Sequence, residues 1–283
     1  MARIRVQRAD SMKRVSVEHL REDAARAAQE VMWDAWDAPD KKKRVALAKK
    51  ALELSPYCAD AYTMLALETA ATPTKKIELF RKAVEAGEAS LGKQAFRELT
   101  GAFWGFVETR PYMRARHYLG LALWESGQRA EAVAEYRAML ELNPNDNQGI
   151  RYLLIDCLLT LGLDADADAL LKRYKDDGGV GWPWSRALLA FRLKGDGAAA
   201  RKALKIALTN NSYVPPYLLG LRKMPSRLPD YVAVGGEDEA ISYLFTGMAA
   251  WLAAPGALAW LAEQCADGAS ARKSGKRVRK NAA

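Results

Sequence analysis

Residues 113–146 form a 34-residue segment that constrains the fold of this chain more than any other part of it. The segment reads as two helices: small and apolar residues recur at three- and four-residue spacing, a glycine marks the turn, and Asn143–Pro144 ends the second helix. The residues that carry this pattern are Leu119, Gly120, Gly127, Ala132, Tyr136 and Met139. A helix pair of this kind cannot bury its apolar face alone, so the segment predicts further pairs beside it.

The positions of these small and aromatic residues are those of a tetratricopeptide repeat. Gly120 leaves room for the second helix, Ala132 does the same from the other side, and Tyr136 fills the gap between adjacent repeats. Three other segments repeat the unit, near residues 40–87, 147–180 and 181–211. The sequence therefore predicts an all-α fold, a tetratricopeptide-like helical-repeat superhelix (α-solenoid) with a C-terminal helical cap.

We expect four parts along the chain. They are a basic flexible N-terminus, the helical array, a proline-rich wrap with capping helices, and a disordered basic tail, at residues 1–15, 16–211, 212–265 and 266–283. Ser16 is placed to cap the first helix of the array. Residues 88–110 are helical in composition but rich in glycine and aromatic residues, so they are expected to interrupt the repeats.

The predicted C-terminal cap is expected to contact the second helix of the last repeat. Three acidic residues, Glu237 to Glu239, favour the start of a helix because their charge complements its N-terminal dipole. A terminal repeat needs a cover over its apolar edge. We therefore expect Trp251 and Trp260 to lie buried against the second helix of the last repeat, at Leu204 and Leu208.

Residues 240–262 run for 23 positions without a charge, which is the length of a membrane span. Pro255–Gly256 divides this stretch into two pieces that are each too short to cross, so two short buried helices are the favoured prediction and a span is the alternative. The basic N-terminus has no apolar stretch behind it, and no secretory signal is expected. We predict a cytoplasmic location with no membrane contact.

The net charge of +9 lies at the two ends of the chain. Residues 1–14 carry a net +4 and residues 266–283 a net +5, which accounts for the whole excess. The basic residues of the C-terminal tail are Arg272, Lys273, Lys276, Arg277, Arg279 and Lys280. The tail has no aromatic residue to stack on bases, so any nucleic-acid contact would go through phosphates; a tail that only solubilises the chain is the alternative.

The cysteines do not form a metal or disulfide pattern. Cys58, Cys157 and Cys265 lie far apart without a CxxC pair, and only His19 and His117 could join them. Small buried thiols are the predicted role, most clearly for Cys157 in its apolar run.

The alternating acids Asp164, Asp166 and Asp168 invite a comparison with a calcium loop. Ala169 and Lys175 stand where that loop needs a glycine and a bidentate glutamate, so the pattern fails at two positions. Acids in the first turn of a helix, one of them acting as its cap, are predicted instead.

Beyond the repeats, the chain resembles a known family. The segment YTMLALETAATPTKKIELFRKAVEAGE near the front and VPPYLL, GGEDEAISY and the Trp251 to Leu261 segment at the back are similar to the soluble C-terminal region of the suppressor-of-tumorigenicity-seven family. The likeness covers roughly residues 40–265. It implies a helical repeat fold with a binding role and no catalytic residues, and this chain is expected to lack the membrane-spanning N-terminal part of the family.

A binding surface is predicted on the concave side of the array, which the first helix of each unit lines. The expected partner is a peptide or helix with acidic residues, held between arginines and apolar walls. In the alternative, these arginines are solvated or paired with neighbouring acids. The predicted lining residues are Arg114, His117, Leu121 and Trp124 in one unit, Gln148, Arg151, Ile155 and Leu158 in the next, and Trp182, Ser185, Leu189 and Arg192 in the last.

These patterns predict a non-enzymatic scaffold or adaptor that binds a protein or peptide partner. His117 has no nucleophile or carboxylate at a readable spacing, and no catalytic, cofactor or metal constellation is visible. The alternative function is a nucleic-acid- or ribosome-associated protein that uses its basic tails.

Overall fold

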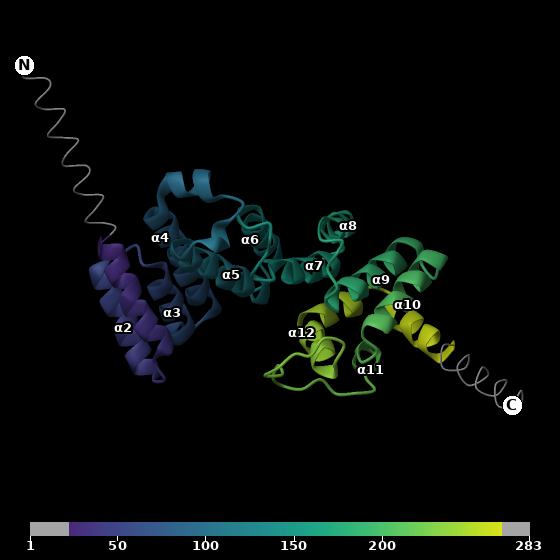
Figure 1. The fold of residues 1–283 in the computed structure, drawn as a ribbon. Helices are drawn as coiled ribbons and strands as arrows, with labels where there is room; N and C mark the ends of the chain where they lie inside the picture. The colour runs from purple at the N-terminus through teal and green to yellow at the C-terminus, as the bar shows by residue number, and fades with distance from the viewer. Residues whose placement is uncertain (1–22, 268–283) are drawn as a thin grey trace, which may run out of the picture. The chain divides into compact units, whose positions relative to one another are not determined.

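The computed structural model describes residues 23–267, which form helices without a β-strand among them; most connections are short, and residues 219–236 form a long irregular one (Figure 1). The chain divides into two compact units, residues 1–150 and 151–283. Within each unit, consecutive helices pack as antiparallel pairs, which confirms the predicted all-α repeat fold. Ser16 lies outside the described residues, so its predicted capping role stays a prediction.

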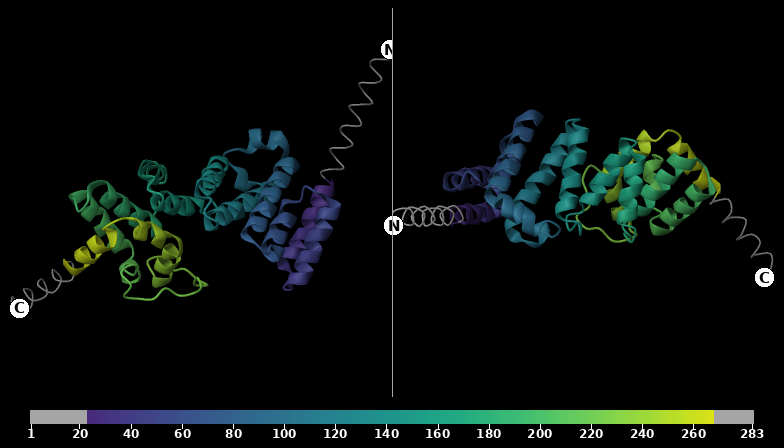
Figure 2. Two further views of the ribbon diagram at one scale, coloured as in Figure 1. Left: turned by 180° about the vertical axis from the view of Figure 1, so that it is seen from behind. Right: turned by 90° about the horizontal axis from the view of Figure 1, so that it is seen from above.

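The N-terminal unit begins with a helix at residues 23–37, followed by α2 (Lys41–Leu54), α3 (Ala59–Thr69) and α4 (Pro73–Leu99). It continues with two short 3₁₀ turns (Phe103–Gly105 and Val107–Thr109), α5 (Arg110–Glu125) and α6 (Arg129–Leu142). Each helix packs on the next, and α3 also contacts α5 (Figure 2). The helix of residues 23–37, α3 and α5 are thus the first helices of three successive pairs.

The predicted segment 40–87 holds three helices, not one two-helix unit. α2 belongs to the pair that residues 23–37 begin, because alanines and methionines from both helices share one buried cluster. The buried members of that cluster are Ala28, Met32, Ala35, Ala48, Ala51, Cys58, Ala61 and Met64. Its small side chains let the helices approach closely.

The predicted interruption at residues 88–110 is largely a continuation of α4. This helix runs to Leu99 through a kink at Gly92, whose φ of 68° favours glycine. The aromatic rings of this segment then cluster on α5: Phe96 lies 5.1 Å from Phe103 and 5.2 Å from Tyr112, measured between ring centroids. The glycine and aromatic content therefore builds a bend that packs on α5.

The complete repeat at α5 and α6 depends on a close approach between Gly120 and Tyr136, both of which are buried. A Cβ atom at Gly120 would lie 2.6 Å from the Cε1 atom of the Tyr136 ring. The helix ends also match the pattern: Gly127 has a φ of 83° in the turn, and α6 ends at Leu142 with Asn143 as its C-cap.

The C-terminal unit contains α7 (Ile150–Thr160), α8 (Asp164–Arg173), α9 (Gly181–Lys194) and α10 (Ala198–Asn210). A short helix, α11 (Val214–Leu218), lies at the start of the predicted proline-rich wrap. The unit ends with α12 (Glu237–Ala253) and a last helix at Ala257–Asp267. α12 begins at Glu237 with three acids in its first turn, as predicted.

The uncharged stretch 240–262 folds as two helices that meet at Pro255–Gly256 with a bend of 109°. No single helix among residues 23–267 is long and apolar enough to cross a membrane, whereas this bent pair passes the same test of length and composition. Trp251, Trp260 and Leu261 of the pair are buried. Two helices that meet at the proline were the favoured prediction.

The aromatic contacts of the cap are with the first helix of the last repeat, whereas the sequence predicted contact with the second helix. Trp251 and Trp260 are buried, as expected. Their ring contacts, however, are with α9, the first helix of the last repeat: Trp251 lies 5.8 Å from Trp184, and Trp260 stacks on Phe191 at 4.6 Å. The sequence predicted packing on Leu204 and Leu208 of α10 and did not predict these ring contacts. They arise because α12 lies along the face of the first helices.

The close approach of α5 and α6 gives a first prediction. Replacing Gly120 with alanine puts a methyl group into the Tyr136 ring, so the helices must separate. Overpacking of this kind costs about 1–3 kcal/mol of the free energy of unfolding, to be measured by urea denaturation. Gly105→Ala is the matched control, because nothing lies within 4 Å of its added Cβ. Equal stabilities for the two variants would contradict the predicted packing role of Gly120.

Candidate partner-binding face

The predicted arginine of the N-terminal unit is held inside the protein's own network. Arg114 donates two hydrogen bonds to Asp60, from Nε to Oδ1 at 2.9 Å and from Nη2 to Oδ2 at 2.7 Å. The Asp60 side chain is fully buried, and Gln29 also donates to it at 2.9 Å. The Arg114 guanidinium lies 5.7 Å from the ring centroid of Trp36. This network joins the first helices of three consecutive pairs.

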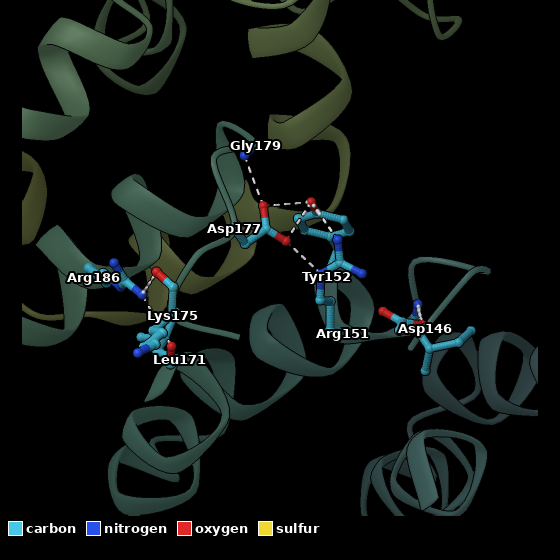
Figure 3. Close-up of polar contacts among 9 residues, drawn as sticks. Asp146, Arg151, Tyr152, Leu171, Lys175, Asp177, Gly179 and Arg186 are labelled. Atoms are coloured by element: carbon cyan, nitrogen blue, oxygen red, sulfur yellow. Dashed lines mark hydrogen bonds and ion pairs between the residues drawn. The ribbon is translucent and has the colours of Figure 1, made fainter. Parts of the chain in front are cut away.

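The arginine of the next repeat is also paired. Arg151 Nε donates to Asp177 Oδ2 at 2.5 Å, and the Tyr152 hydroxyl and the Gly179 amide donate to the same carboxylate (Figure 3). The Arg151 guanidinium lies 4.5 Å from the Tyr152 ring centroid. Burial, together with the Asp177 carboxylate, raises the pKa of Tyr152 to about 12. Asp177 thereby fixes the turn before α9 to the start of α7.

Arg192, the third predicted arginine, donates from Nε to Asp164 Oδ1 at 2.8 Å. All three arginines therefore follow the alternative in which they pair with neighbouring acids.

Asp164 does lie in the first turn of α8, but the N-cap residue of this helix is Leu163, so the predicted capping role of an aspartate is wrong. Asp168 pairs with Lys172 at 2.5 Å.

Three other residues predicted to line the groove in the C-terminal unit are covered. Ile155, Trp182 and Ser185 have exposed fractions of 1%, 0% and 0%, so they form no part of an open groove. The physical reason for part of this burial is α12: its Thr246 hydroxyl donates to Asp156 on α7 at 2.5 Å. Its Trp251 packs on Trp184 of α9. A segment of the chain itself occupies this face.

The predicted face of α5 remains half-exposed. His117, Leu121 and Trp124 follow Arg114 at three- and four-residue spacing, and all four side chains are of intermediate burial. His117 stacks on Tyr118 at 5.9 Å, and burial lowers its pKa. Gln148, in the connection before α7, is half-buried. The six basic residues predicted for the tail, between Arg272 and Lys280, lie outside the described residues.

The sequence analysis missed a cavity of about 290 Å³ in the C-terminal unit. It lies between α7, the turn that leads into α9, and α12. Its lining residues are Tyr152, Ile155, Asp156, Gly179, Val180, Gly181, Glu239, Ser242, Tyr243 and Thr246. The signal in the sequence was Asp156 itself, the one charge in the apolar run 153–159, but its partners lie about 90 positions away on α12.

Asp156 is the more deeply buried of the two carboxylic acids that line this cavity. Burial raises the pKa of its carboxyl from 3.8 to about 7, and the only opposing influence is the hydrogen bond from Thr246. The other titratable residues of the lining are Glu239 and the two tyrosines. Burial and the nearby Asp156 carboxylate raise the pKa of Tyr243, so this phenol stays neutral.

Glu239 has a structural role at the edge of the same cavity. Its carboxylate accepts hydrogen bonds from the Val180 amide at 3.3 Å, the Asn211 side chain at 3.2 Å and the Gly235 amide at 2.8 Å. The first turn of α12 is thus fastened to the beginning of α9 and to the end of α10. Glu239 is satisfied by these donors, whereas Asp156 has a single hydroxyl partner.

Comparison with known proteins identifies the family. Residues 15–194 match the family described as "ST7 protein". The chain belongs to the ST7 family. This confirms the resemblance seen in the sequence, although the match begins earlier than residue 40 and does not include the C-terminal segments that appeared most distinctive.

Several relatives align with most of this ST7 family chain. It is 28% identical to "Protein ST7 homolog" from Caenorhabditis elegans over 279 residues, covering 84% of the chain and 50% of the relative. It is 29% and 30% identical to "Suppressor of tumorigenicity 7 protein-like" from Danio rerio and Bos taurus, covering 82% and 83% of the chain and 43% and 46% of those proteins. The chain thus spans about half the length of these relatives.

One solved structure that is similar to this chain is reported as "Crystal structure of YrrB: a TPR protein with an unusual peptide-binding site". The two chains are 20% identical with a TM-score of 0.42, and the match covers 60% of this chain and 77% of the other.

The buried Asp156 gives a second prediction. Because its pKa is raised in the folded state, the folded protein binds the proton more tightly than the unfolded chain does. The contribution of Asp156 to stability is therefore complete below about pH 4 and is lost as the pH rises to about 7. Replacing Asp156 with asparagine keeps a hydrogen-bond acceptor for Thr246 and removes this loss.

At pH 8 we expect Asp156→Asn to be more stable than the parent by up to about 4 kcal/mol, with the gain falling toward zero near pH 4. The measurement is urea denaturation at pH 4, 6 and 8. Asp34→Asn, an exposed aspartate on the helix of residues 23–37, serves as the control and should show no pH-dependent gain. A stability difference for Asp156→Asn that does not change with pH would contradict the assigned burial.

Proposed function

We propose that this chain is a non-enzymatic interaction protein that binds a segment of a partner polypeptide through the faces of its first helices. The observation that supports the proposal is the packing of α12 against α7 and α9. In the C-terminal unit this face accepts a helix through a buried tryptophan pair and one partly buried hydrogen bond. A face that holds one helix has the chemistry to hold another.

The corresponding face of the N-terminal unit supports the same role. It is formed by the helix of residues 23–37, α3 and α5, which the Asp60 network joins. Trp36, His117, Leu121 and Trp124 contribute half-buried apolar and aromatic surface beside that network. Tryptophan side chains are enriched at surfaces that bind polypeptides.

The ion pairs change the nature of the expected partner. Arg114 already satisfies Asp60, so a partner carboxylate would have to compete with a bidentate pair whose acid is fully buried. Leaving Asp60 without its cation would be costly. The apolar and aromatic side chains of α5 are therefore the expected anchors, in place of the arginines named from the sequence.

Residues of the ion-pair networks are poor test sites, because their replacement would destabilise the protein. A photo-activated phenylalanine derivative at Trp124, on α5, reports contact without breaking an ion pair; it removes only the contact of the Trp124 ring with the Arg129 guanidinium, 5.2 Å away. We expect it to cross-link one polypeptide in an extract of the native cells, giving a discrete band of increased mass. The same derivative at Ala134, which is exposed on α6, is the control and should give at most a tenth of that product.

Equal cross-linking from positions 124 and 134, or none from position 124 and from a second site at Leu121, would exclude this face as the binding surface. The cross-linked variants must keep the melting temperature of the parent, so that an absent product reflects the surface and not unfolding.

A further inference from the structure

The cavity beside α12 has a charge that the rest of the fold does not neutralise. Asp156 lines it with an exposed fraction of 6%, and within residues 23–267 its side chain is hydrogen-bonded by the neutral hydroxyl of Thr246. By contrast, the buried Asp60 side chain pairs with Arg114, and the Asp177 side chain pairs with Arg151. A buried carboxylate without a cation is unfavourable, because burial removes its hydration and no opposite charge replaces it.

The other groups around Asp156 supply no positive charge. Glu239 is acidic, and the Tyr152 and Tyr243 phenols are neutral at physiological pH. Ser242 and Thr246 add hydroxyl groups, and Ile155 and Val180 add apolar wall. The nearest arginine along the chain, Arg151, does not line the cavity and is held by Asp177. The lining therefore complements a cation that has an apolar stem.

The volume of the cavity and the geometry around the Asp156 carboxylate limit the chemical class of cation that the cavity can bind. A volume of about 290 Å³ lies at the small end of ligand sites, so it suits one side chain or a small molecule. Thr246 occupies Oδ2 of Asp156, which leaves Oδ1 as the principal acceptor. A guanidinium prefers to engage both oxygens of a carboxylate, whereas an ammonium group acts as a compact point charge. Tyrosine rings in the lining add attraction for such a cation.

From these observations we propose that the cavity binds a primary alkylammonium group, with Asp156 as its counter-ion. The group can come from a lysine side chain of the partner polypeptide or from a small free amine. The lysine source rests on the proposed function, whereas the chemistry of the cavity does not.

The first experiment measures binding of n-butylammonium chloride to the full chain at pH 8. Chemical shifts of the Gly179, Gly181 and Thr246 backbone amides report the cavity directly. We expect saturable changes at these amides with n-butylammonium and none with n-butanol, which has the same apolar chain without the charge. Absence of a saturable change at high millimolar amine, or an equal response to n-butanol, would overturn the proposal.

Two variants separate the counter-ion from the shape of the cavity. Asp156→Asn keeps the size and the acceptor for Thr246, and should weaken amine binding at least tenfold while the protein stays folded. Ser242→Phe should block the cavity from α12 without touching the carboxylate, and should abolish binding. Asp230→Asn, an exposed aspartate in the connection before α12, is the matched control and should bind as the parent does. Unchanged binding by Asp156→Asn would overturn the assignment.

The pH dependence adds a signature that a merely structural aspartate would not give. An amine of this kind stays protonated up to about pH 10, so the titrating group between pH 5 and 8 is Asp156. Its carboxyl, with a pKa of about 7, must lose its proton to bind the cation. We expect affinity to rise about 100-fold from pH 5 to pH 8 in the parent and to be flat in Asp156→Asn. A flat profile in the parent would contradict Asp156 as the counter-ion.

The source of the ammonium group is decided by a peptide comparison. A short alanine-rich peptide with one central lysine is titrated beside the same peptide with norleucine at that position. Tighter binding of the lysine peptide than of n-butylammonium indicates a partner side chain, and the reverse indicates a free amine. Either result supports the cavity chemistry, and the cross-linking at position 124 tests the proposed function independently.

Discussion

The C-terminal unit depends on the burial of Trp251 of α12 against Trp184 of α9. Both side chains are fully buried, and two tryptophans of this size bury a large apolar area when they meet. With α12 in this position, Thr246 and Tyr243 lie over the first helices, and Glu239 is fastened to three donors. The cavity forms because α12 meets α7 and the turn into α9 without filling the space between them.

The same arrangement explains why Asp156 differs from the other acids of the first helices. Asp60 on α3 lies where Arg114 of α5 reaches it, and Asp177 in the turn before α9 lies where Arg151 of α7 reaches it. Asp156 faces α12, whose residues 240–253 carry no charge, so only a hydroxyl reaches it. Burial raises the pKa of this carboxyl to about 7, so its charged form is unfavourable in the free protein. A bound cation stabilises that charged form. The burial of Asp156 and the proposed ligand chemistry thus both follow from the uncharged part of α12, residues 240–253.

Much of the fold could be predicted from the sequence because local patterns carry it. Gly120 and Tyr136, the turn glycine Gly127 and the Asn143–Pro144 stop all act within one helix pair, where spacing determines contact. The ST7 family resemblance, likewise, rests on contiguous segments. Burial of Trp251 also followed from composition, since a large apolar residue near the end of an array needs a cover.

The site could be predicted only in part, because it depends on contacts between distant segments. Spacing placed Arg114 and Arg151 on the first helices, but it did not show that Asp60 and Asp177 would engage them. The helical period placed Ser185 on the inner face of α9, so we expected its side chain to be exposed. Ser185 is instead buried, because α12 covers that face. Asp156 was visible as a lone charge in an apolar run, and its meaning came only with Thr246, 90 positions later.

The most direct test of the account is the pKa of Asp156, measured from the ¹³C chemical shift of its side-chain carboxyl as the pH is varied, with and without saturating n-butylammonium. The account predicts titration near pH 7 in the free protein and a clear shift to lower pH when the amine is bound. Titration near pH 4 in the free protein, or a pKa that the amine does not change, would contradict it.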